Sequence, residues 1–219
     1  MITVHHLDHS RSQRILWLLE ELGLSYDIKF YKRGADMLAP AELKAVHPLG
    51  KSPVITDGVG TLAESGAIID YLLNSYGGGR LMPAAGTAER LTYTYWMYAA
   101  EGTFMTPLLL KLIANGIRQR TPFLLKPVGA GIASRLEKTL VAPNLAAHVA
   151  FWEQTLGKTP WFAGDDFTAA DIMMSFPVEA AASRAGAGDK PRIREWLNAI
   201  HARPAYKRAL ERGGPYAYA

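Results

Sequence analysis

Cysteine is absent from this sequence of 219 residues. Its absence excludes disulfide bonds, zinc–thiolate sites and a protein thiol as nucleophile, so any thiol chemistry must use the sulfur of a bound molecule. Long hydrophobic runs are also lacking, because residues 104–110 form too short a stretch to cross a bilayer and contain a proline. Residues 1–14 are too polar for a signal peptide. We therefore expect a cytoplasmic chain with no membrane partner.

Charge of one sign is only slightly in excess, since 24 Lys and Arg residues against 20 Asp and Glu residues give a net charge of +4. The three histidines near the N-terminus (His5, His6 and His9) lack partners at the spacing of a metal site, so we expect no metal and no cofactor. A loose basic region lacks the interleaved aromatic residues of a nucleic-acid site and indicates a solvated face. It comprises Arg118, Arg120, Lys126, Arg135 and Lys138.

The first 76 residues alternate between strand and helix patterns. Apolar residues recur at helical spacing over 15–22 and alternate over 26–31 as in a half-buried strand, and Asp57-Gly58 is a hairpin turn signal. The expected elements are strands around 2–4, 26–31, 53–56 and 59–62, and helices over 15–22, 42–46 and 65–76. The order β-α-β-α-β-β-α predicts an α/β domain whose first two strands are parallel.

No strand pattern follows the glycine-rich break at residues 77–83. We expect an α/β domain over 1–78, a linker over 79–86 and an all-α domain over 87–219. The predicted helices cover 89–113 with a kink at Pro107, then 130–140, 144–156, 169–185, 192–202 and 205–211. The run from Phe167 to Ile172 has the form of a capping box with a hydrophobic staple, in which Thr168 is the N-cap and Asp171 the third helical residue.

Ser10 lies in the turn between the first strand and the first helix. A serine there can simply cap the helix by accepting a backbone N–H. Alternatively, its hydroxyl can donate to a thiolate bound at the helix N-terminus, where the helix dipole also favours negative charge. Lowering a thiol pKa by two units requires only about 2.7 kcal/mol.

A second group of candidates surrounds the predicted hairpin. Ser52-Pro53 is either an ordinary trans turn or a cis bond that leaves the backbone of Val54 free for a peptide-like ligand. Glu64-Ser65 either caps the next helix or recognises an amino-acid head group, with the serine at a carboxylate and the glutamate at an ammonium. Lys51 can meet a second carboxylate or remain a solvated charge.

These motifs, in this order, resemble those of the glutathione transferase family along almost the entire chain. They are most similar to serine-type enzymes of bacteria and fungi, in particular a yeast-type group related to the theta class. The lack of a cysteine near Ser10 and of a tyrosine in the first turn argues against the thiol-transferring and tyrosine-dependent classes. The resemblance is carried by Leu7-Asp8-His9-Ser10-Arg11-Ser12, Tyr31-Lys32-Arg33, His47-Pro48-Leu49-Gly50-Lys51-Ser52-Pro53 and Ala63-Glu64-Ser65-Gly66.

The resemblance implies a thioredoxin-like domain followed by a helical bundle, with Pro53 in the cis form. It implies that Ser10 is catalytic, with Ser12 as the second choice. It also implies a γ-glutamyl site at Glu64 and Ser65, backbone pairing at Val54, and Lys51 near the glycyl carboxylate. The glutathione-binding residues that it implies are Lys51, Ser52, Pro53, Val54, Glu64 and Ser65.

The expected activity is transfer of glutathione, a co-substrate, to a small hydrophobic electrophile. Residues of the first long helix either line the electrophile pocket or pack in the core; they are Tyr95, Tyr98, Glu101 and Met105. The family and the aromatic residues of this helix (Tyr93, Tyr95, Trp96 and Tyr98) also predict a two-fold homodimer. The alternative is a noncatalytic protein of the same fold that binds a hydrophobic ligand or a protein partner.

Overall fold

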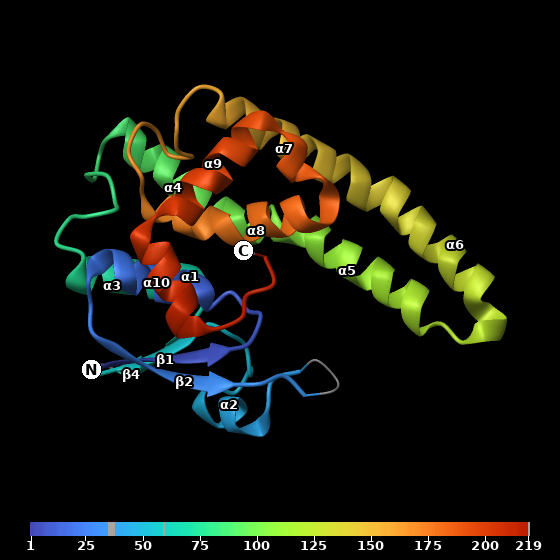
Figure 1. Ribbon diagram of the computed structural model, residues 1–219, viewed down its shortest axis with the longest axis horizontal. Coiled ribbons are helices and arrows are strands. Elements are labelled where there is room, and N and C mark those ends of the chain that lie inside the picture. The colour runs from blue at the N-terminus through green and yellow to red at the C-terminus, as the bar shows by residue number, and fades with distance from the viewer. Residues whose placement is uncertain (35–37, 59, 219) are drawn as a thin grey trace.

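The computed structural model describes residues 1–34, 38–58 and 60–218. It shows a small sheet beneath a bundle of helices, with the first and third helices of the chain between them (Figure 1). The elements of the first half are β1 (Ile2–Leu7), α1 (Gln13–Leu22), β2 (Tyr26–Tyr31), α2 (Ala41–Val46), β3 (Val54–Asp57), β4 (Gly60–Ala63) and α3 (Ser65–Tyr76). This order confirms the expected β-α-β-α-β-β-α fold. Val59, expected in the second hairpin strand, lies outside the described residues.

The sheet has the strand order β2-β1-β3-β4. β1 and β2 are parallel, as the strand–helix–strand pattern predicted, whereas β1–β3 and β3–β4 are antiparallel. α1 and α3 cover one face of this sheet and α2 covers the other (Figure 1). The chain reversals at the end of β1 and the start of β3 therefore lie close together in space.

α1 occupies the centre of the molecule. Its apolar side chains, including Trp17, are almost completely buried, and the helix ends at Gly23, whose φ of 66° suits a residue without a Cβ. The C-terminal helix packs against α1, because Glu20 of α1 accepts from Arg208 at 2.8 Å and from Arg212 at 3.1 Å. The helix that leads away from Ser10 is thus enclosed by both halves of the chain.

The second half is helical wherever it has regular structure. Its helices are α4 (Ala88–Gly102), α5 (Met105–Arg120), α6 (Lys126–Leu136), α7 (Ala142–Leu156), α8 (Ala169–Ala185), α9 (Pro191–Ala202) and α10 (Pro204–Gly213). The expected all-α second half is confirmed, and α8 has the predicted bounds. It begins at Thr168, where the expected capping box with Asp171 is present.

Two predicted helices differ from the structure. The helix expected over 89–113 is divided into α4 and α5 at Thr103 and Phe104 rather than kinked at Pro107. Pro107 lies in the first turn of α5, where a missing N–H costs nothing. The break expected between 140 and 144 is instead a π-helical turn, Glu137–Val141, that joins α6 to α7. A π turn inserts one residue into a helix, and here it lets the helical path continue from α6 into α7, with Pro143 in the first turn of α7.

Candidate functional site

Three serine hydroxyls meet where β1 ends and β3 begins. The Oγ of Ser10 lies 2.7 Å from that of Ser12 and 3.0 Å from that of Ser52, and it accepts from the Ser12 backbone N–H at 3.3 Å. Ser12, rather than Ser10, occupies the N-cap position of α1. Ser52 precedes Pro53, and their peptide bond is cis, as the resemblance implied.

His6 fixes the direction of these hydrogen bonds. Burial lowers the pKa of His6 to about 4, against weaker opposing effects of Asp8 and a backbone hydrogen bond to Gly213, so the ring is neutral near pH 7. The bond to Gly213 uses the proton of the ring, and Nδ1 lies 2.8 Å from Ser12 Oγ. We infer that the ring proton is on Nε2, the nitrogen that Ser12 does not contact, so that Nδ1 accepts from the Ser12 hydroxyl.

This assignment distinguishes the two candidate thiolate donors. On this assignment the proton of Ser12 points to His6, so Ser12 Oγ accepts from Ser10 and the hydroxyl of Ser52 donates to Ser10. Ser12 is fully buried, whereas Ser10 lies on the wall of an open cavity. The Ser10 hydroxyl is thus the one whose proton can turn toward a bound sulfur.

The cavity beside Ser10 has a volume of about 330 Å³. Its walls combine basic and apolar side chains, with no carboxylate among the described residues that line it. These residues are Leu7, His9, Ser10, Arg11, Arg33, Leu38, Ala39, Lys44, Leu49, Gly50, Lys51, Ser52 and Phe176. Lys51 is exposed at the rim, and Phe176 comes from α8 of the helical half. The site is positively charged and is closed on one side by the second half of the chain.

Ser65 and Glu64 lie at the start of α3. Ser65 is buried, and its Oγ accepts from Arg14 Nη2 at 2.9 Å, which leaves its own proton available to a ligand. Glu64 is exposed and has a φ of 76°, an uncommon value for a residue with a Cβ. Pro53, Glu64 and Ser65 are not among the described residues that line the cavity. Pro53 follows Ser52, which lines it, and Ser65 is linked to the lining residue Arg11 through Arg14 and Glu101.

Val54 differs from expectation. It faces His5 of β1 on one side and Ala63 of β4 on the other, so its peptide groups point at neighbouring strands. The backbone of Ser52 precedes the strand, and no backbone hydrogen bond is formed by it within the described ranges. The peptide group available to a ligand therefore belongs to Ser52, because the sheet pairing begins at Val54 and not later.

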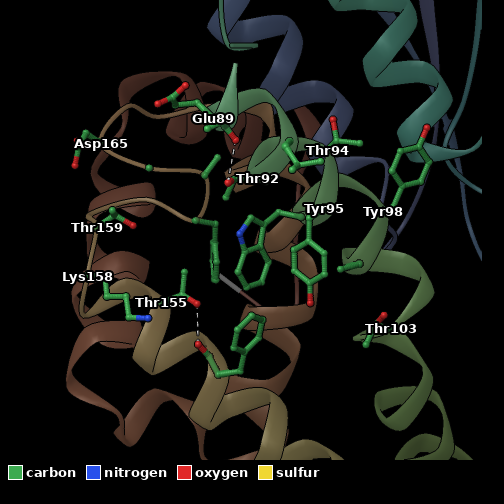
Figure 2. Close-up of a pocket in the computed structure, with 18 residues that line it drawn as sticks. Glu89, Thr92, Thr94, Tyr95, Tyr98, Thr103, Thr155, Lys158, Thr159 and Asp165 are labelled. Carbon is green, nitrogen blue, oxygen red and sulfur yellow. Dashed lines mark hydrogen bonds between the residues drawn. The ribbon is translucent and has the colours of Figure 1, made fainter. Parts of the chain in front are cut away.

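The four residues predicted for the second-substrate pocket do not lie together. Tyr95 and Tyr98 line a separate pocket of about 1060 Å³ on the faces of α4 and α7, which shares no lining residue with the cavity at Ser10 (Figure 2). Met105 packs against the main core. Glu101 reaches the site, but as the partner of two arginines. Tyr95 and Tyr98 therefore do not line the cavity at Ser10 as expected. Helical spacing shows that they share one face of α4, but it does not show which part of the protein that face lies against.

Arg14 is a site residue that the sequence did not reveal. Its guanidinium is buried and donates to Ser65, to the carbonyl oxygen of Met173 at 2.8 Å and to Glu101. Glu101 also accepts from Arg11 at 2.5 Å. Burial alone would raise the pKa of Glu101, but the charges of Arg14 and Arg11 outweigh it and lower the pKa. Arg14 follows a polar turn and precedes the apolar residues of α1, so its pattern is that of an exposed first-turn arginine.

Comparisons with known proteins agree with this geometry. The family model described as the N-terminal domain of glutathione S-transferase matches residues 1–74, and the model of the C-terminal domain matches residues 132–212. Glutathione S-transferase 1 of Saccharomyces cerevisiae is 32% identical over 97% of this chain and 95% of its own length. Glutathione S-transferase 3 of Schizosaccharomyces pombe is 33% identical over 97% and 88%. The chain belongs to the glutathione S-transferase family.

A solved glutathione S-transferase from Actinobacillus pleuropneumoniae is 34% identical, with a TM-score of 0.75 over 97% of this chain and 93% of that one. The predicted glutathione transferase family, fold and enzyme class are confirmed. The N-terminal transferase model covers Ser10, Ser52 and Ser65. The serine-type subgroup and the role of each residue stay predictions. No group of three or more His, Cys, Asp or Glu residues in the described part of the chain is placed to hold a metal.

Proposed function

We propose that this glutathione transferase activates the thiol of glutathione with the hydroxyl of Ser10. The observation that carries the proposal is the cluster of hydroxyls at Ser10, whose Oγ lies 3.0 Å from that of Ser52 and 2.7 Å from that of Ser12, with Ser12 Oγ in turn 2.8 Å from His6 Nδ1. A hydroxyl that already accepts a hydrogen bond is a better donor. With glutathione bound, the proton of Ser10 turns from Ser12 to the sulfur and stabilises the thiolate beside the N-terminus of α1.

Glutathione is held by its charged ends and its peptide middle. The γ-glutamyl carboxylate binds the Ser65 hydroxyl at the start of α3, and the nearby Glu64 carboxylate binds the ammonium group. The peptide of the cysteinyl unit pairs with the backbone of Ser52, next to Pro53. The glycyl carboxylate is attracted by Lys51 at the rim of the cavity.

The electrophile enters on the side of the cavity that the helical half supplies. Phe176 of α8 offers apolar surface there, and Leu49 and Arg11 of the first half line the same cavity, with Arg11 held by Glu101. The thiolate sulfur forms a bond to the electrophilic atom of a small hydrophobic substrate, and the substrate either keeps the electron pair or releases it with a leaving group. The protein lowers the thiol pKa and holds both reactants together.

The test compares Ser10→Ala with Ser12→Ala in the full chain. Ser10→Ala should leave the dissociation constant of glutathione within a few-fold, because its charged ends are bound elsewhere. Turnover should fall roughly ten- to a thousand-fold, the range for losing one aimed donor. The pKa of bound glutathione, read from thiolate absorbance against pH, should rise toward the free-thiol value of about 8.5. Ser12→Ala should change the turnover and the thiol pKa less than Ser10→Ala does.

A thiol pKa that stays low in Ser10→Ala and rises in Ser12→Ala would assign activation to Ser12 instead. Glu64→Ala serves as the matched binding control. It should weaken glutathione binding strongly while changing the thiol pKa little, because its carboxylate is exposed at the other end of the ligand.

We infer a homodimer that forms through the pocket on α4 and α7. Leu91 and Tyr98 of α4 are 75% and 72% exposed, and Phe151 of α7 is 40% exposed, so a large apolar surface faces solvent in the single chain. A second copy burying this face in an isologous contact would remove at least about 1,000 Å² from water. The cytoplasm is the proposed location, since the chain lacks cysteine and its co-substrate is a reduced thiol.

A further inference from the structure

The hairpin formed by α5 and α6 has an unusual charge distribution. Between Glu101 and Glu137 the sequence contains no acidic residue, but it contains five basic residues. These are Lys111, Arg118, Arg120, Lys126 and Arg135. The hairpin also projects farther from the body of the molecule than any other helix pair in the described chain (Figure 1). A protruding element that carries basic side chains and no acidic ones creates a local positive potential.

The tip of this hairpin is apolar. Phe123, Leu124 and Leu125 form one 3₁₀ turn between the helices, and their exposed fractions are 80%, 87% and 55%. Val128, in the first turn of α6, adds a further exposed apolar side chain at 60%. Three consecutive large apolar residues at the most remote point of a chain are costly to leave in water. Their exposure is not explained by the glutathione site or by the α4–α7 face.

The cations of the hairpin are only partly neutralised. Lys111 and Arg118 share one carboxylate, that of Glu137, at 3.1 and 2.6 Å. Arg120 and Lys126, which flank the apolar turn, form no ion pair within the described ranges. The ammonium of Lys126 lies over the ring of Phe123, 5.8 Å from its centroid. The exposed apolar turn and two cations without an ion pair in the described chain, Arg120 and Lys126, therefore lie together at one end of the hairpin.

We propose that the tip of the α5–α6 hairpin docks reversibly on an anionic lipid surface. The apolar turn enters the headgroup region, and Arg120 and Lys126 meet lipid phosphates and carboxylates beside it. A convex, narrow tip can insert into a fluid lipid surface, because lipids rearrange around it. A folded protein partner would instead need a concave site of complementary shape. The expectation of no membrane partner rested on the absence of a spanning segment. The described helices indeed include none long and apolar enough to span, but an interfacial contact needs none.

The experiment measures binding of the full chain to vesicles by co-sedimentation. Phosphatidylcholine vesicles are compared with vesicles of phosphatidylcholine and phosphatidylserine at seven to three. Each interfacial cation contributes about fivefold to binding an anionic surface, so Arg120→Gln with Lys126→Gln should lower the partition coefficient about 30-fold. Phe123→Ser with Leu124→Ser should lower it at least about tenfold. Raising the salt from 0.1 to 1 M shortens the Debye length from about 10 to about 3 Å and should release the protein.

The matched control is Lys190→Gln with Lys207→Gln, which removes the same charge from exposed positions elsewhere. It should bind anionic vesicles as the parent does, and all three double variants should keep full transferase activity. Equal losses in the control and the tip variants would overturn the proposal, because net charge alone would then explain binding. It would also be overturned by failure of the parent to prefer anionic vesicles. A changed oligomeric state of the Phe123→Ser, Leu124→Ser variant without vesicle binding would identify the tip as a protein contact and overturn it as well.

Discussion

Replacing Asp171 with alanine should destabilise the protein far more than the loss of an ordinary helix cap. The carboxylate is fully buried and accepts from the backbone N–H of Thr168 at 3.1 Å, from that of Phe162 at 3.0 Å and from Trp196 Nε1 at 3.1 Å. The lost capping bond costs about 1 kcal/mol. The N–H groups of Phe162 and Trp196 are then buried without acceptors, at about 1.5 kcal/mol each. The expected loss is about 4 kcal/mol.

Urea denaturation at pH 7 measures this loss, and Thr87→Ala is the matched control. Thr87 caps α4 through one bond from the Arg90 backbone N–H at 3.1 Å, but in an exposed position. Its replacement should cost only about 1 kcal/mol. If Asp171→Ala cost no more than Thr87→Ala, the argument from buried unpaired donors would be wrong. The glutathione dissociation constant of the folded variant should hardly change.

The pH dependence of the same variant gives a second result. Burial raises the pKa of Asp171 to about 6, although the hydrogen bonds from Phe162, Thr168 and Trp196 oppose the rise. The folded state therefore binds this proton more tightly than the unfolded state, and the stability due to Asp171 decreases as pH rises through 6. The difference between the parent and Asp171→Ala should be about 1 kcal/mol larger at pH 5 than at pH 7. A difference that shrinks toward pH 5 would contradict the raised pKa.

Two further predictions concern the buried ion pair and the dimer. Glu101→Gln leaves the guanidinium of Arg14 buried without an anion and should cost about 3 kcal/mol in urea while raising the KM for glutathione. Glu137→Gln is the control and should cost under about 1 kcal/mol, because its partners Lys111 and Arg118 keep contact with water, whereas Arg14 does not. Leu91→Lys with Tyr98→Lys should convert the dimer to a 24.0 kDa monomer in sedimentation at micromolar concentration, and a parent that is already monomeric would refute the proposed interface.

The fold was predictable where local patterns decide it. The capping box at Thr168 and Asp171 marks the start of α8 because its hydrogen bonds join residues three apart, and the hairpin turn at Asp57-Gly58 is equally local. The division between α4 and α5 was missed, because the break was assigned to Pro107, whereas α4 ends at Gly102, a residue type that favours helix ends. A proline is also compatible with the first turn of a helix, so the sequence does not show whether α5 begins before or after Pro107.

Only the part of the candidate site that comes from the α/β half of the chain was predictable. Ser10 and Ser52 stand at chain reversals of one small sheet, and sheet topology brings such reversals together. Tyr95 and Tyr98 depend instead on how a helix of the second half is rotated against its neighbours, which periodicity does not specify. Arg14 was missed for the same reason, since its acidic partner is 87 residues away in the sequence.

The packing of α10 on α1 has a consequence for the order in which the active site is completed during synthesis. Gly213 lies so close to α1 that an added Cβ would be 2.7 Å from Gln13 and Leu16. The residues proposed to bind glutathione leave the ribosome early, but α10, which covers the helix beside Ser10, begins only at Pro204, 139 residues after Ser65 (204 − 65). A nascent chain stopped before Pro204 contains every proposed glutathione contact and still exposes the buried side of α1. We therefore expect the proposed activation of the thiol by Ser10 to begin only after the second half of the chain has folded over the first.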